Sequence, residues 1–318
     1  MHSRREFLKT SSGLLAAGGL LHAAADWKGQ IGLELYTVRD LLDKDFAGTI
    51  ARVAEIGYRE VEPVGYGGLD PRQFRALLDK NKLTAPSTHA GATAGPDLEK
   101  QLEGHQIMGF KYTEVRAAGG GAAGRGQGRG VPGAGRAAGA ARGPAQPRPR
   151  QSVEAVKRSA AQYNDFGKIT RKFGMKILIH NHTQEFELLD DGKTTQYDVL
   201  LAETDPSLVA MQLDIGWASV AGQNILDMFR KNPGRYELWH VKDAVGMRGL
   251  DPKLTPNERR GKTKLVPVGQ GEVDYKAIFP KADLAGMKHF AIEQDNAAES
   301  GDSMASAKAS YDGLRRLI

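Results

Sequence analysis

The 318-residue sequence contains no cysteine, and this one absence removes several classes of function. The chain has no disulfide framework, no thiolate nucleophile and no sulfur ligand for zinc or for an iron–sulfur cluster. Any metal must therefore be held by histidine or by the carboxylates of Asp and Glu.

Long apolar runs are also missing. No stretch reaches the roughly eighteen apolar residues that span a bilayer, and the longest apolar stretch lies at the N-terminus. None of the predicted strands leads directly into a Gly-x-Gly-x-x-Gly turn that begins a helix, so a dinucleotide-binding fingerprint is absent. The first absence excludes an integral membrane protein, and the second leaves a doubly wound nucleotide-binding sheet without support.

The net charge of +6 is concentrated in one segment. Residues 117–151 contain six Arg and no acidic residue. The whole sequence has 44 Lys and Arg against 38 Asp and Glu, so outside this segment the basic and acidic residues are equal in number. The rest of the chain is thus balanced, and its charge indicates no nucleic-acid partner.

The same segment, within residues 116–151, differs in composition from the rest of the chain. Residues 117–151 comprise eleven Gly, ten Ala, six Arg, four Pro, three Gln and one Val, which cannot bury enough apolar area to offset the entropy of ordering. We interpret it as a low-complexity insertion without a catalytic role. The same composition is also consistent with three alternatives: a flexible lid, a segment that contacts an anionic polymer, and a stretch of GC-rich coding sequence read in the wrong frame.

The N-terminal residues resemble a twin-arginine export signal. Arg4 and Arg5 lie in the sequence SRREFLK at 3–9, an apolar stretch follows at 11–25, and small residues at 23–25 precede Asp26. We predict a signal peptide at 1–25, a mature domain at 26–318, a periplasmic or otherwise exported location, and no membrane insertion once the signal is removed.

Apolar runs of strand length alternate with segments of helical periodicity along the mature chain. The helical segments have clear limits, such as the Asp70-Pro71 start and the stops at Gly57 and Gly174. Buried parallel strands read as continuous apolar runs, and eight strand–helix units in roughly 290 residues favour a closed barrel. We therefore predict an α/β fold, a (β/α)8 TIM barrel, with a doubly wound sheet as the alternative. The predicted strands cover residues 31–38, 60–64, 85–88, 111–115, 176–181, 209–214, 237–242 and 290–294.

Polar residues follow four successive predicted strands in the second half of the chain. They lie in the sequences IHNHTQEF at 179–186, QLDIGW at 212–217, LWHVKD at 238–243 and AIEQD at 291–295. In a barrel these strand ends meet at one mouth. Each polar residue alone has a structural explanation, but together a histidine and several carboxylates predict a site for Mn²⁺, Mg²⁺, Co²⁺ or Zn²⁺.

This series of strand ends resembles the sugar phosphate isomerase/epimerase superfamily of xylose isomerase-like barrels. The resemblance extends over nearly the whole mature chain, from GLELYTVRD at 32–40 to EQD at 293–295. It implies that Asp214, His240 and Glu293 are metal ligands. The family's Glu at the tip of strand five has no counterpart here, so we expect Glu185 as the fourth ligand, with His182 as the alternative.

The resemblance also implies roles in substrate binding and catalysis. Glu62 and His89 end the second and third predicted strands, where relatives line the substrate pocket. Lys242 follows His240 by two residues, so both side chains point to the same face of a strand. The implied substrate-binding residues are Glu62, His89, His180 and Trp217, with Tyr36 as a second aromatic wall, and the implied catalytic residues are Glu185, Glu293 and Lys242.

The implied chemistry is metal-assisted removal of a proton from a carbon next to a carbonyl, through an enediolate. We predict a divalent-metal-dependent isomerase or epimerase acting on an unphosphorylated sugar or ketosugar, because an exported enzyme rarely meets sugar phosphates. The alternatives are a lyase or dehydratase acting on a 3-ketosugar, keto-glycoside or inosose, and a non-catalytic sugar-binding barrel. A metal-dependent endonuclease is disfavoured by the balanced charge, and the exact substrate and a homo-oligomeric state stay open.

Overall fold

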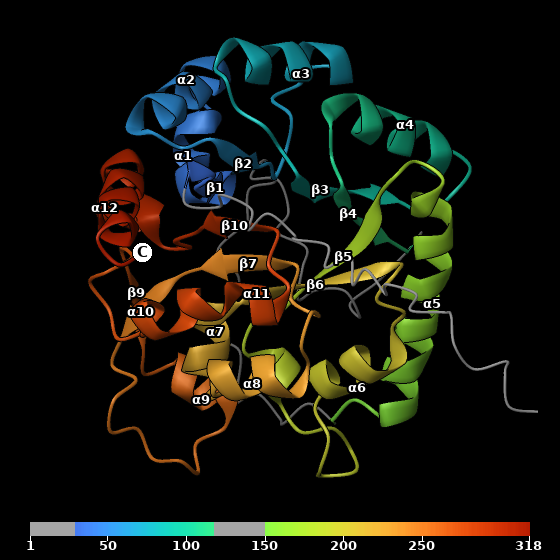
Figure 1. Ribbon diagram of the computed structural model, residues 1–318, viewed down its shortest axis with the longest axis vertical. Coiled ribbons are helices and arrows are strands. Elements are labelled where there is room, and N and C mark those ends of the chain that lie inside the picture. The colour runs from blue at the N-terminus through green and yellow to red at the C-terminus, as the bar shows by residue number, and fades with distance from the viewer. Residues whose placement is uncertain (1–28, 118–149) are drawn as a thin grey trace, which may run out of the picture.

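The computed structural model describes residues 29–117 and 150–318, and in them eight parallel strands form a nearly closed barrel surrounded by helices (Figure 1). The predicted signal peptide at 1–25 and nearly all of the predicted insertion at 116–151 lie outside the described residues. The barrel strands are β1 (Gly32–Glu34), β2 (Glu60–Glu62), β3 (Ser87–Thr93), β4 (Tyr112–Arg116), β5 (Lys176–His180), β6 (Val209–Asp214), β7 (Leu238–Val241) and β10 (His289–Ile292).

The strand order β2-β1-β10-β7-β6-β5-β4-β3 runs around a ring. Between β2 and β3 the ring is closed by a few backbone hydrogen bonds near the two strands and, in the described residues, by no continuous strand pairing. Among them, Val61 N–H donates to Thr84 O at 2.8 Å and His89 N–H donates to Pro63 O at 2.9 Å. The predicted (β/α)8 barrel is confirmed. The doubly wound alternative is wrong, because the first and last strands in the chain, β1 and β10, are paired neighbours.

The helices begin where the sequence supplies side chains that satisfy their first backbone N–H groups. Asp45 caps one helix, and Asp70 with Gln73 forms a capping box at the next. No helix within residues 29–117 and 150–318 has the length and apolar composition needed to cross a membrane. The helices are α1 (Arg39–Leu42), α2 (Phe46–Ile56), α3 (Pro71–Lys80), α4 (Leu98–Met108), α5 (Val153–Arg171), α6 (Gln196–Glu203), α7 (Ile215–Val220), α8 (Ile225–Lys231), α9 (Pro256–Arg260), α10 (Tyr275–Ile278), α11 (Ala282–Ala285) and α12 (Ser303–Arg315).

The core explains why the strands were recognisable. All six residues of β6 are buried, since one face of the strand points into the barrel and the other packs on helices. On the outer face of β7, Trp239 stacks on Phe229 of α8 with ring centroids 5.2 Å apart and packs edge-on against Phe279. The helices are therefore held by apolar contacts, and the barrel interior is left for polar side chains at one end.

An antiparallel hairpin follows β7 and was not predicted. It consists of β8 (Asp243–Val245) and β9 (Lys264–Val266). The Asp243 carboxylate accepts hydrogen bonds from Gly269 N–H and Gly271 N–H, both at 2.9 Å, and from Val273 N–H at 3.1 Å. Asp243 thus fixes the loop after the hairpin and is not part of the barrel mouth.

His105 of α4 should make the fold sensitive to acid. Its ring bonds to Tyr66 and Thr113, and burial lowers its pKa to about 4. The unfolded chain binds a proton near pH 6.5 and the folded chain does not, so folding stability falls as pH drops from 6.5 towards 4. Between pH 7.5 and 5 we expect His105 to account for about 2 kcal/mol of lost unfolding free energy. Urea denaturation of His105→Gln at both pH values should show a loss smaller by that amount, and an equal loss would contradict this assignment.

Candidate metal centre

Every strand of the barrel contributes an ionisable side chain to the interior, either from the strand itself or, for β10, from the residue that follows it. All of them are buried except His89, which is partly exposed. They are Glu34 (β1), Glu62 (β2), His89 (β3), Glu114 (β4), His180 (β5), Asp214 (β6), His240 (β7) and Glu293, which directly follows β10. Carboxylates outnumber the basic groups, so the mouth is a site that favours a cation.

Asp214, His240 and Glu293 form a compact group with the geometry of a metal site. One ligand atom from each lies within 4.8 Å of the others. His240 Nδ1 is 2.9 Å from Glu293 Oε2 and 4.0 Å from Asp214 Oδ2. Donor atoms bound at about 2.1 Å to one ion are separated by about 3 to 4 Å. Their carboxylate and imidazole donors suit Zn²⁺, Mn²⁺ or Co²⁺, so these residues fit a divalent cation.

Two other groups of residues in the described chain also bring ligand atoms within 4.8 Å: Glu34, Glu62 and His240, and the three histidines His89, His180 and His240. The three histidines converge poorly. The His89 and His240 rings are stacked, with centroids 5.2 Å apart and planes only 19° apart. Their nitrogen lone pairs lie in nearly parallel planes and cannot meet at one ion, so a carboxylate-containing group is the better site.

His240 is held between carboxylates on its two ring nitrogens. Nε2 lies 2.5 Å from Glu62 Oε2 and Nδ1 faces Glu293. Burial would lower the pKa of His240, but the charges of Glu62 and Glu293 outweigh it and raise the pKa to about 9. Burial likewise opposes ionisation of Glu62, yet His89 and His240 lower its pKa to about 2. Glu62 is thus an anion that orients the histidine.

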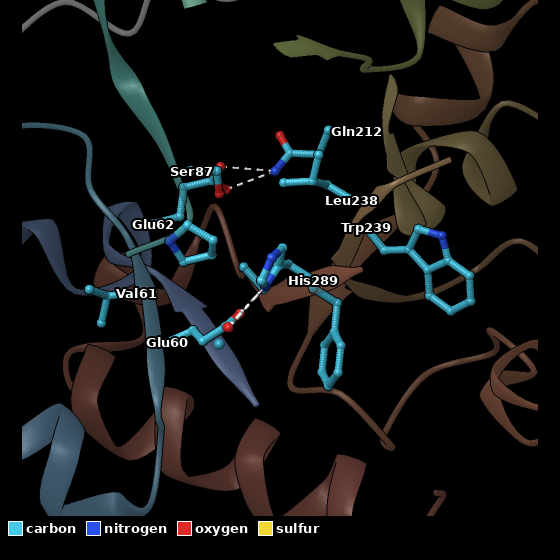
Figure 2. Close-up of a pocket in the computed structure, with 12 residues that line it drawn as sticks. Glu60, Val61, Glu62, Ser87, Gln212, Leu238, Trp239 and His289 are labelled. Carbon is cyan, nitrogen blue, oxygen red and sulfur yellow. Dashed lines mark hydrogen bonds and ion pairs between the residues drawn. The ribbon is translucent and has the colours of Figure 1, made fainter. Parts of the chain in front are cut away.

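Gln212 joins two of the predicted pocket residues, Glu62 and His89. Its amide nitrogen donates to both Glu62 oxygens, at 2.9 and 3.0 Å, and its amide oxygen accepts from His89 Nε2 at 2.7 Å. Figure 2 shows this amide pointing at the Glu62 carboxylate, with the Glu60–His289 contact below it. Sequence reasoning missed Gln212, although it precedes Asp214 by two residues and so shares its face of the strand.

Lys242 is fully buried beside the metal-site group. Its Nζ lies 2.9 Å from Asp214 Oδ2, 2.7 Å from Glu293 Oε2 and 2.8 Å from Asp295 Oδ2. Burial raises the pKa of Asp214, and the charge of Lys242 opposes that rise. The structure therefore brings the predicted catalytic lysine to the predicted ligands, together with Asp295, which sequence reasoning had not selected.

The strand-five residues differ in where their side chains point. Glu185 Oε2 accepts a hydrogen bond from His182 N–H at 2.7 Å, so this carboxylate is turned to its own loop, and burial raises its pKa. Glu185 and His182 belong to none of the close groups of ligand atoms in the described residues. His180 Nε2 instead lies 3.6 Å from Asp214 Oδ2, and burial lowers the pKa of His180 well below its usual value, which keeps the imidazole neutral.

The two predicted aromatic walls have different surroundings. Trp217 is buried in α7, with the Arg260 guanidinium 4.5 Å and Lys242 Nζ 5.4 Å from its ring centroid. Tyr36 has the Arg39 guanidinium 3.9 Å from its ring centroid. Trp217 therefore contacts the site through Lys242, and the hairpin segment carrying Arg260 covers it.

Two further carboxylates were missed from the sequence. Glu34 Oε2 lies 3.4 Å from His240 Nδ1, and Glu114 Oε1 lies 3.7 Å from His89 Nδ1. Burial raises the pKa of Glu114. Glu34 is the last residue of β1 and Glu114 lies in the middle of β4. An acidic residue in a short barrel strand whose other side chains are mostly buried is the signal that could have identified them.

Several known proteins are similar to this chain. An inosose dehydratase of Geobacillus thermodenitrificans is 28% identical over 142 residues, covering 42% of this chain and 46% of the relative. The chain thus spans less than half the length of the curated relative that it matches. A sugar phosphate isomerase/epimerase from Parabacteroides distasonis superposes with a TM-score of 0.62 at 20% identity, over 90% of this chain and 94% of that one.

Two other solved structures were described with metals. The IOLI protein with a bound zinc atom has a TM-score of 0.61 at 13% identity, covering 91% of this chain and 98% of that one. A xylose isomerase-like TIM barrel protein from Mycobacterium smegmatis in complex with magnesium has a TM-score of 0.54 at 15% identity, covering 91% and 96%. At these identities the solved structures support the fold. The sequence model of the xylose isomerase-like TIM barrel family matches residues 50–317, so this chain belongs to that family.

Proposed function

We propose that this protein is a divalent-metal-dependent enzyme that removes a proton next to the carbonyl of an unphosphorylated 3-ketosugar, keto-glycoside or inosose and eliminates the β-oxygen. This proposal rests mainly on the group formed by Asp214, His240 and Glu293 at the barrel mouth, whose ligand atoms lie within 4.8 Å of one another. The Lys242 ammonium lies beside this group. A bound divalent cation would supply the positive charge that stabilises the enediolate. A non-catalytic sugar-binding barrel has no need of such a group.

The residues of the chain supply the binding and proton-transfer steps. Asp214, His240 and Glu293 hold the cation, and we propose His180, rather than Glu185 or His182, as the strand-five donor because it lies closest to Asp214. Gln212 donates to the Glu62 carboxylate and accepts from His89 Nε2, which fixes the polar wall that receives the substrate hydroxyls.

Elimination requires one base and one acid. Glu293 accepts the proton from the substrate carbon, and Lys242 gives a proton to the departing oxygen, which leaves as water or as an alcohol. Because Glu293 and Lys242 are neighbours, the proton then passes from the carboxylic acid to the amine, and both groups return to their starting states. The similarity to inosose dehydratase favours this outcome over the predicted isomerisation.

Isomerisation or epimerisation is the second candidate. His240 has Glu62 on Nε2 and Glu293 on Nδ1, so two carboxylates lie on different sides of one imidazole. Such a pair could remove a proton on one face of the substrate and return one on the other. Both candidates pass through the same enediolate, and they differ only in whether that intermediate loses an oxygen or regains a proton.

Deuterium exchange separates these functions. The metal-loaded protein would be incubated in D₂O with an inosose, a 3-keto-glucoside and a free ketohexose, and the products followed by NMR. We expect deuterium-labelled starting material together with an unsaturated product. A labelled epimer or isomer without unsaturation would replace elimination by the second candidate. Binding without any exchange of a carbon-bound proton would contradict both and favour the sugar-binding barrel.

The predicted export signal bears on the substrate class. An exported enzyme meets glycosides and free sugars rather than cytoplasmic sugar phosphates, and we propose that residues 1–25 direct this protein out of the cytoplasm. Fractionation of cells expressing the Arg4→Lys, Arg5→Lys variant tests the proposal. Export equal to that of the unaltered chain would rule out a twin-arginine route.

A further inference from the structure

We propose that the Lys242 ammonium competes with the divalent cation for the same two carboxylate oxygens, and that Asp295 is the positioning residue that holds Lys242 when the metal is bound. This inference rests on the proposed metal site and adds a device to it. Without the metal, the positive charge of Lys242 neutralises the Asp214 and Glu293 carboxylates. When the metal is bound, Lys242 pairs with Asp295 instead, beside the substrate.

The Lys242 ammonium contacts the same carboxylate oxygens that the divalent cation would use. Lys242 Nζ contacts Asp214 Oδ2 at 2.9 Å and Glu293 Oε2 at 2.7 Å. These are the same oxygens that face His240 Nδ1, at 4.0 and 2.9 Å, in the metal-site group. The ammonium therefore lies on the ligand atoms themselves.

Both cations cannot keep these contacts at full strength. A metal ion about 2 Å from each oxygen would lie only a few ångströms from an ammonium that contacts the same two atoms. Lys242 is fully buried, so the repulsion between the two charges is poorly screened. Metal binding must therefore move the ammonium or proceed against its charge.

Asp295 offers the displaced ammonium a partner. Its Oδ2 lies 2.8 Å from Lys242 Nζ, and its side chain is 15% exposed, against 0% for Asp214 and 2% for Glu293. Asp295 follows Glu293 by two residues, beyond the end of β10 and therefore farther towards the barrel mouth. A small rotation of the flexible lysine side chain keeps the Asp295 contact and frees the two inner oxygens.

The competition can be measured as metal affinity, without any enzyme assay. The full-length protein would be stripped of metal by chelation and titrated with Mn²⁺, with free Mn²⁺ read by electron paramagnetic resonance. Lys242→Met removes the competing charge, and Lys242→Gln does so while keeping a polar group should the methionine variant fail to fold. We expect both to bind Mn²⁺ about tenfold more tightly or better. Equal or weaker binding would overturn the competition.

Asp295→Asn tests the holding role. The ammonium then has only the inner oxygens, so Mn²⁺ binding should weaken several-fold. In the Lys242→Gln, Asp295→Asn double variant that weakening should vanish, because no ammonium is left to redirect. An equal loss of affinity in the double variant would show that Asp295 acts on the metal directly and would contradict its role through Lys242.

A second ion pair provides the matched control. Lys176 pairs with Glu237 at the opposite end of the barrel strands, so Lys176→Met changes the net charge as Lys242→Met does. We expect Mn²⁺ affinity to stay unchanged in this control. If neither the unaltered protein nor the Lys242 variants bind Mn²⁺, the proposed metal-dependent function itself is wrong. If the unaltered protein binds Mn²⁺ and the Lys242 variants bind it no better, only the competition is wrong.

Discussion

Asp214→Asn is expected to abolish metal retention and to lower turnover at least about a thousandfold while the barrel stays folded. The Asp214 side chain has two roles that the substitution separates. Oδ1 accepts a hydrogen bond from Trp217 N–H at 2.8 Å and so caps α7, and an amide oxygen preserves this cap. Oδ2 is the atom in the metal-site group, and asparagine removes its charge. Metal content by mass spectrometry, turnover and thermal melting report the three effects separately.

Asp227→Asn is the control for this experiment. Asp227 lies on α8 and its exposed carboxylate pairs with Arg230, so metal content and activity should not change. Full metal occupancy and full turnover in Asp214→Asn would remove strand six from the site. The same metal assay decides the strand-five donor, because His180→Gln should lower retention and Glu185→Gln should not.

The fold was predictable because barrel strands are buried on both faces. A strand such as β6 has no solvent face, so its sequence is apolar except where it ends at Gln212 and Asp214. The β8–β9 hairpin was not predictable in the same way. It depends on Asp243 accepting hydrogen bonds from backbone groups 26 to 30 residues away in the chain, and no local pattern carries that information.

The candidate site was predictable in part. Polar residues at successive strand ends indicated that Asp214, His240 and Glu293 would meet, and their ligand atoms do lie together. The strand-five residue was harder, because a short 3-10 turn at Gln184–Phe186 directs the Glu185 carboxylate back to His182 N–H. Side-chain direction in an irregular turn does not follow from strand alternation, so the direction of the Glu185 carboxylate could not be predicted from the sequence.

Gly216 allows Lys242 to approach the metal-site group, although it carries none of the chemistry. It follows Asp214 by two residues, at the start of α7. A Cβ on Gly216 would lie 2.4 Å from Lys242 Cβ and 2.8 Å from Lys242 O, which is closer than real atoms approach. One of these contacts is to the backbone that follows β7 and cannot rotate away. The absence of a side chain at this position therefore sets how closely the ends of β6 and β7 can pack.

Gly216→Ala is accordingly expected to cost about 3 kcal/mol of unfolding free energy, as overpacking of a rigid core does. It should also weaken Mn²⁺ binding, because the added methyl group displaces Asp214 from the other two ligands, His240 and Glu293. Urea denaturation and Mn²⁺ titration measure the two effects. Gly65→Ala is the matched control, since no atom lies within 4 Å of the added Cβ and the backbone there is not in the left-handed region. A Gly216→Ala variant as stable as Gly65→Ala would mean that the β7 backbone yields to the methyl group. Normal stability with weakened metal binding would instead show that the strain is taken up at the site, where Lys242 and the ligands are held by charge rather than by packing.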